Sequence, residues 1–305
     1  MEIARELLKR GLIESASSDA EIILSKKRII YIGVDPTADS MHVGHLVWLL
    51  LMKRLGQAGH ELIFLVGGGT GMIGDPKDKT ERPLLEAKQV QRNVRSLKKQ
   101  LQMVLGKTKF RIVNNGDWLL QLDLNNFLRN VGKHFTVNEL IKRDVIRNRL
   151  SDSDDSISFT EFSYTLLQGY DYLTLNKNFG CDLQIGGSDQ WTNLLSGVGL
   201  IRKELGREVH AITFPLVTDS NGRKFGKSEG NAVWLDSNKT SPENFYNFWL
   251  NQPNDSIEKY LKLYSFKSLK DIDQIVREHN LKIDSQVAQK SLAKEITALV
   301  HGVTF

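Results

Sequence analysis

Two histidines three residues apart, His42 and His45, stand at the start of an expected helix over residues 42–58. Residues at positions i and i+3 share one helix face, and a helix N-terminus attracts anions through its partial positive charge and unpaired N–H groups. With Asp39 or Ser40 as the N-cap, both imidazole N–H groups would stabilise a phosphate whose charge grows in a transition state. A metal pair or two surface histidines are the alternatives, but no nearby His or Cys supplies a third metal ligand. We therefore favour a phosphate site, with Gly44 leaving room for a flat ring against the backbone.

A second segment, residues 221–230, places three cations between glycines in the order Asn-Gly-Arg-Lys-Phe-Gly-Lys-Ser-Glu-Gly. A basic loop beside a phosphate site can close over it and neutralise charge as the reaction proceeds. A solvated basic turn explains the same residues, and the segment alone favours that simpler interpretation.

A polar stripe follows in residues 159–171, where Tyr164, Gln168 and Asp171 recur at i, i+4 and i+7. This spacing puts a phenol, an amide and a carboxylate on one face of a helix. Such a stripe either faces solvent or lines a polar pocket. Because the neighbouring residues are mostly aromatic or leucine, we expect a largely buried helix and a pocket.

Other local patterns fail in their context. Residues 69–74 match the dinucleotide fingerprint GxGxxG after an expected strand, but Asp75-Pro76 does not open a helix. No acidic residue ends a second strand about twenty positions later, where a ribose contact is expected. The phosphate-loop and nucleophile-elbow patterns also fail, at Asp78 and Gln190 respectively. The sequence thus disfavours an NAD-dependent dehydrogenase.

The elements that must position these residues are short apolar runs alternating with helical patterns. Runs that are apolar on both faces and separated by helices predict a parallel α/β sheet of Rossmann-like type. Ligands bind such sheets outside the carboxyl ends of the strands. Four loops of small or polar residues follow the first four strands, and we expect the site there. The expected strands are 28–32, 62–66, 110–113, 181–185 and 210–214, with helices over 42–58 and 84–105 and polar loops at 33–40, 67–71, 114–117 and 186–190.

Two stretches depart from this alternation. Residues 117–177 contain helical patterns without a convincing strand, which predicts a helical insertion within the sheet domain. After residue 231 the strands stop, and 238–243 reads as a helix start with Thr240 or Ser241 as cap and Pro242 in the first turn. We expect a boundary near 220–240, with a sheet domain over residues 1–225 and a small α-helical domain over 226–305.

Composition limits the class of protein. The 305 residues include 41 Lys+Arg, 36 Asp+Glu and 40% hydrophobic residues, which is typical of a folded globular chain. The net charge of +5 permits a polyanionic partner without requiring one. The lone cysteine, Cys181, excludes an internal disulfide and disfavours a Cys-based zinc site, so we expect a cytoplasmic protein. The longest apolar stretch, residues 46–52, is too short to span a membrane.

Together the motifs resemble those of a known family. The segment His42-Val43-Gly44-His45 resembles the HIGH signature, and Lys224-Phe225-Gly226-Lys227-Ser228 the KMSKS signature, of class I aminoacyl-tRNA synthetases. Residues 33–40, 74–76 and 184–191 look like bacterial tyrosyl-tRNA synthetases, and the resemblance covers the chain from residue 1 to 305. It implies a tyrosine–tRNA ligase that forms tyrosyl-adenylate and pyrophosphate from L-tyrosine and ATP, then transfers tyrosyl to the 3′ end of tRNA(Tyr).

The resemblance also implies roles for individual residues in three groups. The first binds tyrosine: Tyr31 and Asp171 at the phenolic hydroxyl, Asp75, Tyr164 and Gln168 at the α-amino group, and Gln190 near the carboxylate. The second, Asp35, Gly44, Gly187 and Asp189, would bind the adenosine part of ATP. The third would stabilise the departing pyrophosphate: Thr37, His42 and His45, with Lys79, Arg82, Lys224 and Lys227 closing from loops and Lys227 also binding ATP.

Further implications concern partners and departures from the family pattern. ATP would enter with Mg²⁺ as a substrate complex, with no metal held by the protein itself and no tightly bound cofactor, and a homodimer would pair through the insertion at 117–177. Phe225-Gly226 replaces Met-Ser in the lysine loop, Ile32 replaces a cysteine that reaches the ribose in some members, and Trp48 replaces a smaller residue. The family normally continues into an S4-type RNA-binding domain that this chain lacks, so we expect adenylate formation with poor tRNA charging.

Two rivals remain beside this interpretation. A tryptophanyl-tRNA synthetase shares the fold, but Tyr31 with Asp171 favours a phenol over an indole. A non-catalytic RNA-binding relative is disfavoured because the histidine pair and the lysine loop are intact.

Overall fold

The computed structural model describes residues 2–75, 86–141, 144–151, 156–218 and 232–305. In this part of the chain six strands form one sheet in the order β1-β6-β5-β2-β3-β4. The strands β2 to β6 pair in parallel, and all five were predicted. The remaining strand, β1, runs antiparallel to β6 and was not predicted because two residues show no period. The bounds are β1 Ser15–Ala16, β2 Ile29–Val34, β3 Glu61–Val66, β4 Arg111–Asn114, β5 Leu183–Gly187 and β6 His210–Phe214.

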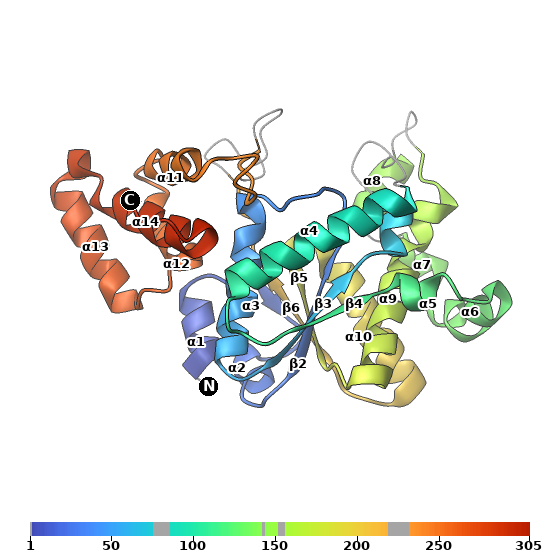
Figure 1. The fold of residues 1–305 in the computed structure, drawn as a ribbon. Helices are drawn as coiled ribbons and strands as arrows, with labels where there is room; N and C mark the ends of the chain where they lie inside the picture. The colour runs from blue at the N-terminus through green and yellow to red at the C-terminus, as the bar shows by residue number, and fades with distance from the viewer. Residues whose placement is uncertain (1, 76–85, 142–143, 152–155, 219–231) are drawn as a thin grey trace.

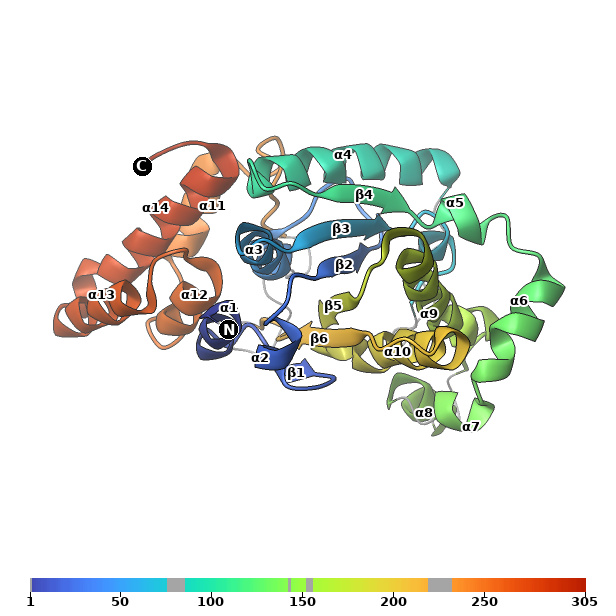
Figure 2. The same cartoon turned by 90° about the horizontal axis from the view of Figure 1, so that it is seen from below.

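Both faces of the sheet are covered (Figures 1 and 2). Ile30 and Ile32 of β2 pack in one core with the helices α3 (Val43–Gln57) and α4 (Ala87–Leu105). Tyr31, between them, belongs to a second core with α9 (Phe159–Phe179) and α10 (Trp191–Leu205). Successive side chains of a strand point to opposite faces, so strands buried on both faces must be apolar throughout. The predicted α/β class with a Rossmann-like sheet is confirmed.

A helical stretch lies between β4 and β5, as the sequence predicted. Its described residues contain no strand. Its last helix, α9, begins with a capping box between Ser158 and Glu161 and ends at Gly180 in the left-handed conformation, with φ of 68°. The other elements of the stretch are α5 (Gly116–Leu119), α6 (Leu124–Asn130), η2 (Gly132–His134), α7 (Val137–Leu140) and α8 (Asp144–Ser151).

The C-terminal residues form a group of helices beside α1 and α3 (Figure 1). The first of them begins at the predicted signal, with Ser241 as N-cap and Pro242 in the first turn. None of the described helices is long and apolar enough to cross a membrane. The group comprises α11 (Pro242–Leu250), α12 (Ile257–Tyr264), α13 (Leu269–Leu281) and α14 (Val287–His301); near the N-terminus lie α1 (Glu2–Lys9) and α2 (Ala20–Ile23).

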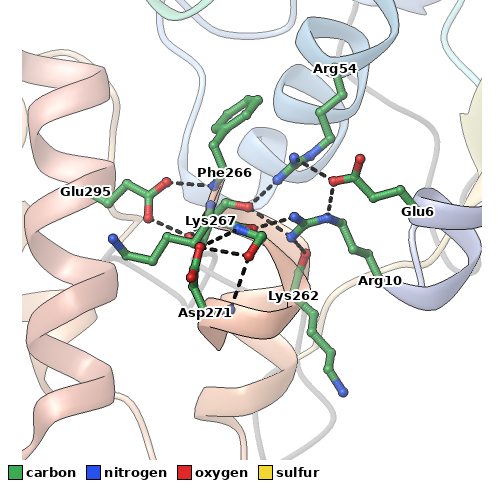
Figure 3. Close-up of polar contacts among 10 residues, drawn as sticks. Glu6, Arg10, Arg54, Lys262, Phe266, Lys267, Asp271 and Glu295 are labelled. Atoms are coloured by element: carbon green, nitrogen blue, oxygen red, sulfur yellow. Dashed lines mark hydrogen bonds and ion pairs between the residues drawn. The ribbon is translucent and has the colours of Figure 1, made fainter. Parts of the chain in front are cut away.

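Two buried arginines join this C-terminal group to the rest of the fold (Figure 3). Arg10 donates to the carbonyls of Lys262 and Ser265, each at 3.1 Å, in the corner between α12 and α13. Arg54, near the C-terminal end of α3, donates to the same Ser265 carbonyl, and its guanidinium lies 4.1 Å from the ring centroid of Phe266. Burial lowers the pKa of Arg54 to about 10, so it stays charged at neutral pH. The helix that begins with the paired histidines is therefore anchored at its other end by the C-terminal helices.

A candidate active site at the carboxyl ends of the strands

A cavity of about 610 Å³ opens at the carboxyl ends of β2, β3 and β5. The loops after these strands, the start of α3 and one face of α9 form its wall. Of the other residues predicted for the site, Gly44 and Asp189 adjoin lining residues, whereas Lys79, Arg82, Lys224 and Lys227 lie outside the described residues. Eleven of the predicted residues line the cavity: Tyr31, Asp35, Thr37, His42, His45, Asp75, Tyr164, Gln168, Asp171, Gly187 and Gln190.

The cavity contains a buried carboxylate, Asp171, which is 1% exposed. Its oxygens accept hydrogen bonds from Asn115 Nδ2 at 2.8 Å and from Trp118 Nε1 at 2.7 Å. Burial raises the pKa of Asp171 to about 7, and the bonds from Asn115 and Trp118 limit this rise because they favour the ionised form. The site thus holds an oriented acceptor that changes charge near neutral pH.

The same cavity contains two buried polar groups without a partner among the described residues. The hydroxyl of Tyr31 and the Oε1 atom of Gln184 are both unsatisfied, and the two residues are register partners on β2 and β5. Burial and the nearby Asp171 carboxylate raise the pKa of Tyr31 well above its ordinary value, so its hydroxyl keeps its proton. Unsatisfied buried polar groups cost free energy, so this wall is suited to a ligand with polar atoms of its own.

A second polar network lies at the rim. Asp75 accepts hydrogen bonds from Gln190 Nε2 at 2.8 Å and from Asn193 Nδ2 at 3.3 Å. Asn193 is buried and also accepts a bond from the Thr165 hydroxyl of α9 at 3.0 Å. Gln190 and Asn193, the latter supported by Thr165 of α9, therefore hold Asp75 in a fixed position.

Asp35 connects the α9 stripe to the loop after β3. The Tyr164 hydroxyl donates to one of its oxygens, and the Thr70 hydroxyl to the other, each at 3.2 Å. A Cβ atom on Gly67 would lie 2.1 Å from Asp35 Oδ1, so only glycine permits this approach. Asp35 thus lies at the junction between the residues expected to bind tyrosine and those expected to bind ATP.

The start of α3 differs from the expected arrangement. Its N-cap is His42 and not Asp39 or Ser40, because Asp39 pairs with Lys239 at 2.5 Å and Ser40 hydrogen-bonds with Gln100. The two histidines form a reciprocal capping box. The Nδ1 atom of His42 accepts from Gly44 N at 3.1 Å, and the Nδ1 atom of His45 accepts from His42 N at 3.0 Å.

This correction determines which nitrogen of each imidazole carries the proton. Since both Nδ1 atoms accept backbone hydrogen bonds, the neutral ring places its proton on Nε2. The ring centroids of His42 and His45 lie 4.0 Å apart, and both rings line the cavity. Two N–H donors fixed by the backbone therefore accompany the positive end of the helix dipole.

Neighbouring elements hold the loop between β2 and α3 in place and also border the cavity. Asn93 of α4 donates to the Pro36 carbonyl at 2.7 Å, and Gln100 accepts from Met41 N at 2.8 Å. Trp234 lies beside His42 with ring centroids 6.1 Å apart, and Val43 N donates to the Val233 carbonyl at 2.9 Å. The cavity wall includes Trp234 and Phe214, which lie on either side of the undescribed residues 219–231 along the chain.

Several residues that contact Asp171 or line the cavity were missed from the sequence. Asn115 lies in the polar loop 114–117, which was expected at the rim, but nothing in the pattern singled out its amide. Trp118 and Gln184 gave no signal, because a tryptophan in a helix and a glutamine in a strand are ordinary. The two unusual residues Ile32 and Trp48 line the cavity, and Trp48 packs between His45 and Phe64 with centroid distances of 6.2 Å to each.

Comparison with known proteins agrees with this geometry. Residues 25–305 match the family described as tRNA synthetases class I (W and Y). The chain is 46% identical to tyrosine–tRNA ligase 1 of Vibrio parahaemolyticus, covering 98% of this chain and 73% of the relative, and 46% identical to tyrosine–tRNA ligase of Roseiflexus castenholzii, covering 98% and 72%. The crystal structure of a C-terminally truncated mitochondrial tyrosyl-tRNA synthetase from Aspergillus nidulans superposes with a TM-score of 0.87 at 32% identity, covering 98% of this chain and 90% of that one.

Proposed function

The chain belongs to the class I tRNA synthetases for tryptophan and tyrosine, and on this premise we propose how its cavity selects and activates tyrosine. Its activity is that of a tyrosine–tRNA ligase. ATP and L-tyrosine give tyrosyl-adenylate and pyrophosphate, and the tyrosyl group then passes to the 3′ end of tRNA(Tyr).

The unsatisfied Tyr31 hydroxyl beside Asp171 determines which amino acid the cavity selects. A phenol can donate to the Asp171 carboxylate and accept from Tyr31, so both groups gain a partner. An indole N–H only donates, which leaves Tyr31 unpaired. Phenylalanine leaves Tyr31 unpaired and gives Asp171 no donor beyond Asn115 and Trp118. Tyrosine–tRNA ligases are themselves the usual illustration of the rule that a site built to bond a hydroxyl rejects the analogue without it.

The rim network suits the α-amino group of the substrate. Asp75 supplies a carboxylate held by Gln190 and Asn193, and an ammonium–carboxylate bond is stronger than a neutral one. Tyr164 and Gln168 come from the same α9 face as Asp171, so one helix binds both ends of the amino acid. In this arrangement Gln190 lies next to the tyrosine carboxylate that attacks ATP.

The start of α3 supports in-line displacement at the α-phosphorus of ATP. The Nε2–H groups of His42 and His45 and the helix N-terminus supply fixed donors where negative charge develops, so no covalent nucleophile is needed. Thr37 lines the same part of the wall. Asp35, Gly44, Gly187 and Asp189 are assigned to the adenosine part of ATP. Mg²⁺ enters bound to the nucleotide phosphates.

Four cations complete the proposed phosphate site. Lys79 and Arg82 follow Asp75 along the chain, and Lys224 and Lys227 lie between Phe214 and Trp234. Support comes from the described residues on either side, since Asp75, Phe214 and Trp234 all line the cavity.

A homodimer through the helical insertion is the proposed assembly. Of seventeen large hydrophobic residues exposed in the described part of the chain, seven lie between residues 120 and 159. Exposed apolar side chains concentrated in one part of the chain are typical of protein interfaces. The proposal includes a catalytic domain over 1–225, a helical domain over 226–305 and a cytoplasmic location. The seven residues are Leu120, Leu124, Leu128, Val137, Ile141, Leu150 and Phe159.

Exchange of pyrophosphate into ATP tests the activation step, with each proteinogenic amino acid supplied separately. We expect tyrosine to drive exchange far better than phenylalanine or tryptophan. Exchange driven by tryptophan, or by none of the amino acids, would contradict the proposal. Asp171→Ala is expected to reduce kcat/KM for tyrosine while the KM for ATP changes little.

A further inference from the structure

A second cavity, of about 1060 Å³, lies at the amino ends of the parallel strands, opposite the active-site cavity. Its wall includes Ile29, Glu61 and Arg111, the first residues of β2, β3 and β4. The active-site cavity opens at the other ends of the same parallel strands, so a ligand bound here is separated from that site by the length of the sheet (Figure 2).

The wall of this second cavity concentrates positive charge. Its Lys and Arg residues number five and its acidic residues one, an excess of four, against a net charge of +5 for the whole chain. Charge gathered on one concave surface attracts anions more strongly than the same charge spread over the surface. The residues are Lys27, Lys53, Lys107, Lys109 and Arg111, with Glu61 as the acid.

Two of these cations already have structural partners. Lys27 pairs with Glu61 at 2.8 Å. Lys53 donates to the Val104 carbonyl at 2.8 Å, where it neutralises the negative end of the α4 dipole. Subtracting them leaves Lys107, Lys109 and Arg111, and none of the three has an ion pair with a described residue.

These three cations are all exposed and lie within five residues of the chain, between the end of α4 and the start of β4. Along 107–111 the residues alternate between exposed and half-buried, so Lys107, Lys109 and Arg111 face solvent while Thr108 and Phe110 point inward. Three cations so close together along the chain can contact neighbouring phosphates of one strand.

Aromatic rings lie among the charges. The Arg111 guanidinium lies 4.9 Å from the ring centroid of Phe179, which follows from α9 packing against the start of β4. Phe179 and Phe110 are both half-buried in the wall. Unpaired RNA bases stack on aromatic rings and on guanidinium planes, whereas phosphates bind the lysines beside them.

We propose that this cavity binds single-stranded RNA, with Lys107, Lys109 and Arg111 on consecutive phosphates and a base stacked at the Arg111–Phe179 pair. The ligand is RNA and not an acidic peptide, because the Arg111–Phe179 pair offers a stacking plane beside the cations. The inference is independent of the activation chemistry, which takes place at the carboxyl ends of the strands. Basic residues at or just before an edge strand such as β4 also prevent sheet-to-sheet association, and that role alone would require no stacking surface.

Fluorescence anisotropy of short labelled uridine and adenosine oligoribonucleotides tests the proposal with the full chain. Three phosphate contacts predict a slope of about −2 for the logarithm of the association constant against that of the salt concentration. The triple variant K107E/K109E/R111E is expected to lose at least tenfold in affinity. The matched control R95E/K98E/K99E, which reverses three exposed charges of α4, should stay within about twofold.

Two further arms identify the ligand. Arg111→Lys keeps the charge and loses the stacking plane, so it should weaken adenosine oligomers several-fold more than tripolyphosphate. Both triple variants should retain tyrosine-dependent ATP–pyrophosphate exchange, which shows that they are folded. Equal RNA affinity of the two triple variants would overturn the site. If tripolyphosphate displaces RNA at equal phosphate concentration, the site binds a free anion and the proposal of an RNA ligand is refuted.

Discussion

Replacing Asp171 by Asn should make the folded protein less sensitive to alkaline pH while it removes tyrosine recognition. Burial raises the pKa of this carboxyl to about 7 from an ordinary 3.8. Between these values the folded chain holds a proton that the unfolded chain has released. By linkage this contribution to stability is complete below about pH 3.8 and is lost as pH rises through 7.

The size of the effect follows from the same values. The free energy of unfolding of the wild type falls by about 1.4 kcal/mol for each pH unit between pH 5 and the pKa of about 7. Between pH 5 and pH 8 the wild type therefore loses about 3 kcal/mol of stability. The asparagine variant has no such proton. It leaves Asn115 or Trp118 without an acceptor, at a cost of about 1–3 kcal/mol that does not depend on pH. The difference in stability between variant and wild type should therefore move by about 3 kcal/mol in favour of the variant between pH 5 and pH 8.

Urea unfolding at several pH values measures this difference, with Asp117→Asn as control because Asp117 is an exposed carboxyl of the same region. In parallel, kcat/KM for tyrosine reports titration of the free enzyme. It should fall as pH drops below about 7, when Asp171 loses its acceptor charge, and Asp171→Asn should abolish this dependence. A stability difference that stays constant from pH 5 to pH 8 would refute the reasoning.

Three other substitutions test the site and the buried ion pair between Arg149 of α8 and Glu161 at the start of α9. Tyr31→Phe removes a buried hydroxyl without a described partner, so thermal stability should not fall, whereas kcat/KM for tyrosine should drop about tenfold and the preference over phenylalanine should shrink. Arg149→Met leaves Glu161 buried without its 2.8 Å partner, and should cost about 3–5 kcal/mol in a denaturant titration; a double variant with Glu161→Leu should recover most of that loss. Gly67→Ala places a methyl group against Asp35 and should lower kcat/KM for tyrosine, with an unchanged value counting against the Asp35–Tyr164 contact.

The framework of the site was predictable because its signals are local and periodic. Strands apolar on both faces predicted the parallel sheet, and polar loops after them predicted the rim. The helical spacing of Tyr164, Gln168 and Asp171 predicted a shared face, and all three line the cavity. These inferences need only the periods of helix and strand and the position of loops in a parallel sheet.

The details that failed depend on tertiary contacts. Asp39 and Ser40 are better capping residues by type than His42, yet Lys239 and Gln100 bind them. Their partners lie 200 and 60 residues away, so no local pattern reveals the competition. The same holds for Asn115, whose amide joins the loop after β4 to α9.

The buried polar groups of the cavity differ in whether they have hydrogen-bond partners within the protein. Asn115 has its amide fully used, because it donates to Thr70 and Asp171 and accepts from Gly69 N. The Asn115 amide, with these hydrogen bonds made, fixes the Asp171 carboxylate. The Tyr31 hydroxyl beside that carboxylate has no described partner. If both were satisfied within the protein, a phenol would gain nothing over a phenyl ring. If neither were fixed, the ligand would bear the cost of ordering them. In the proposed function, selectivity therefore comes from holding one group rigid and leaving its neighbour unsatisfied, at an expense in stability that the substrate hydroxyl removes on binding.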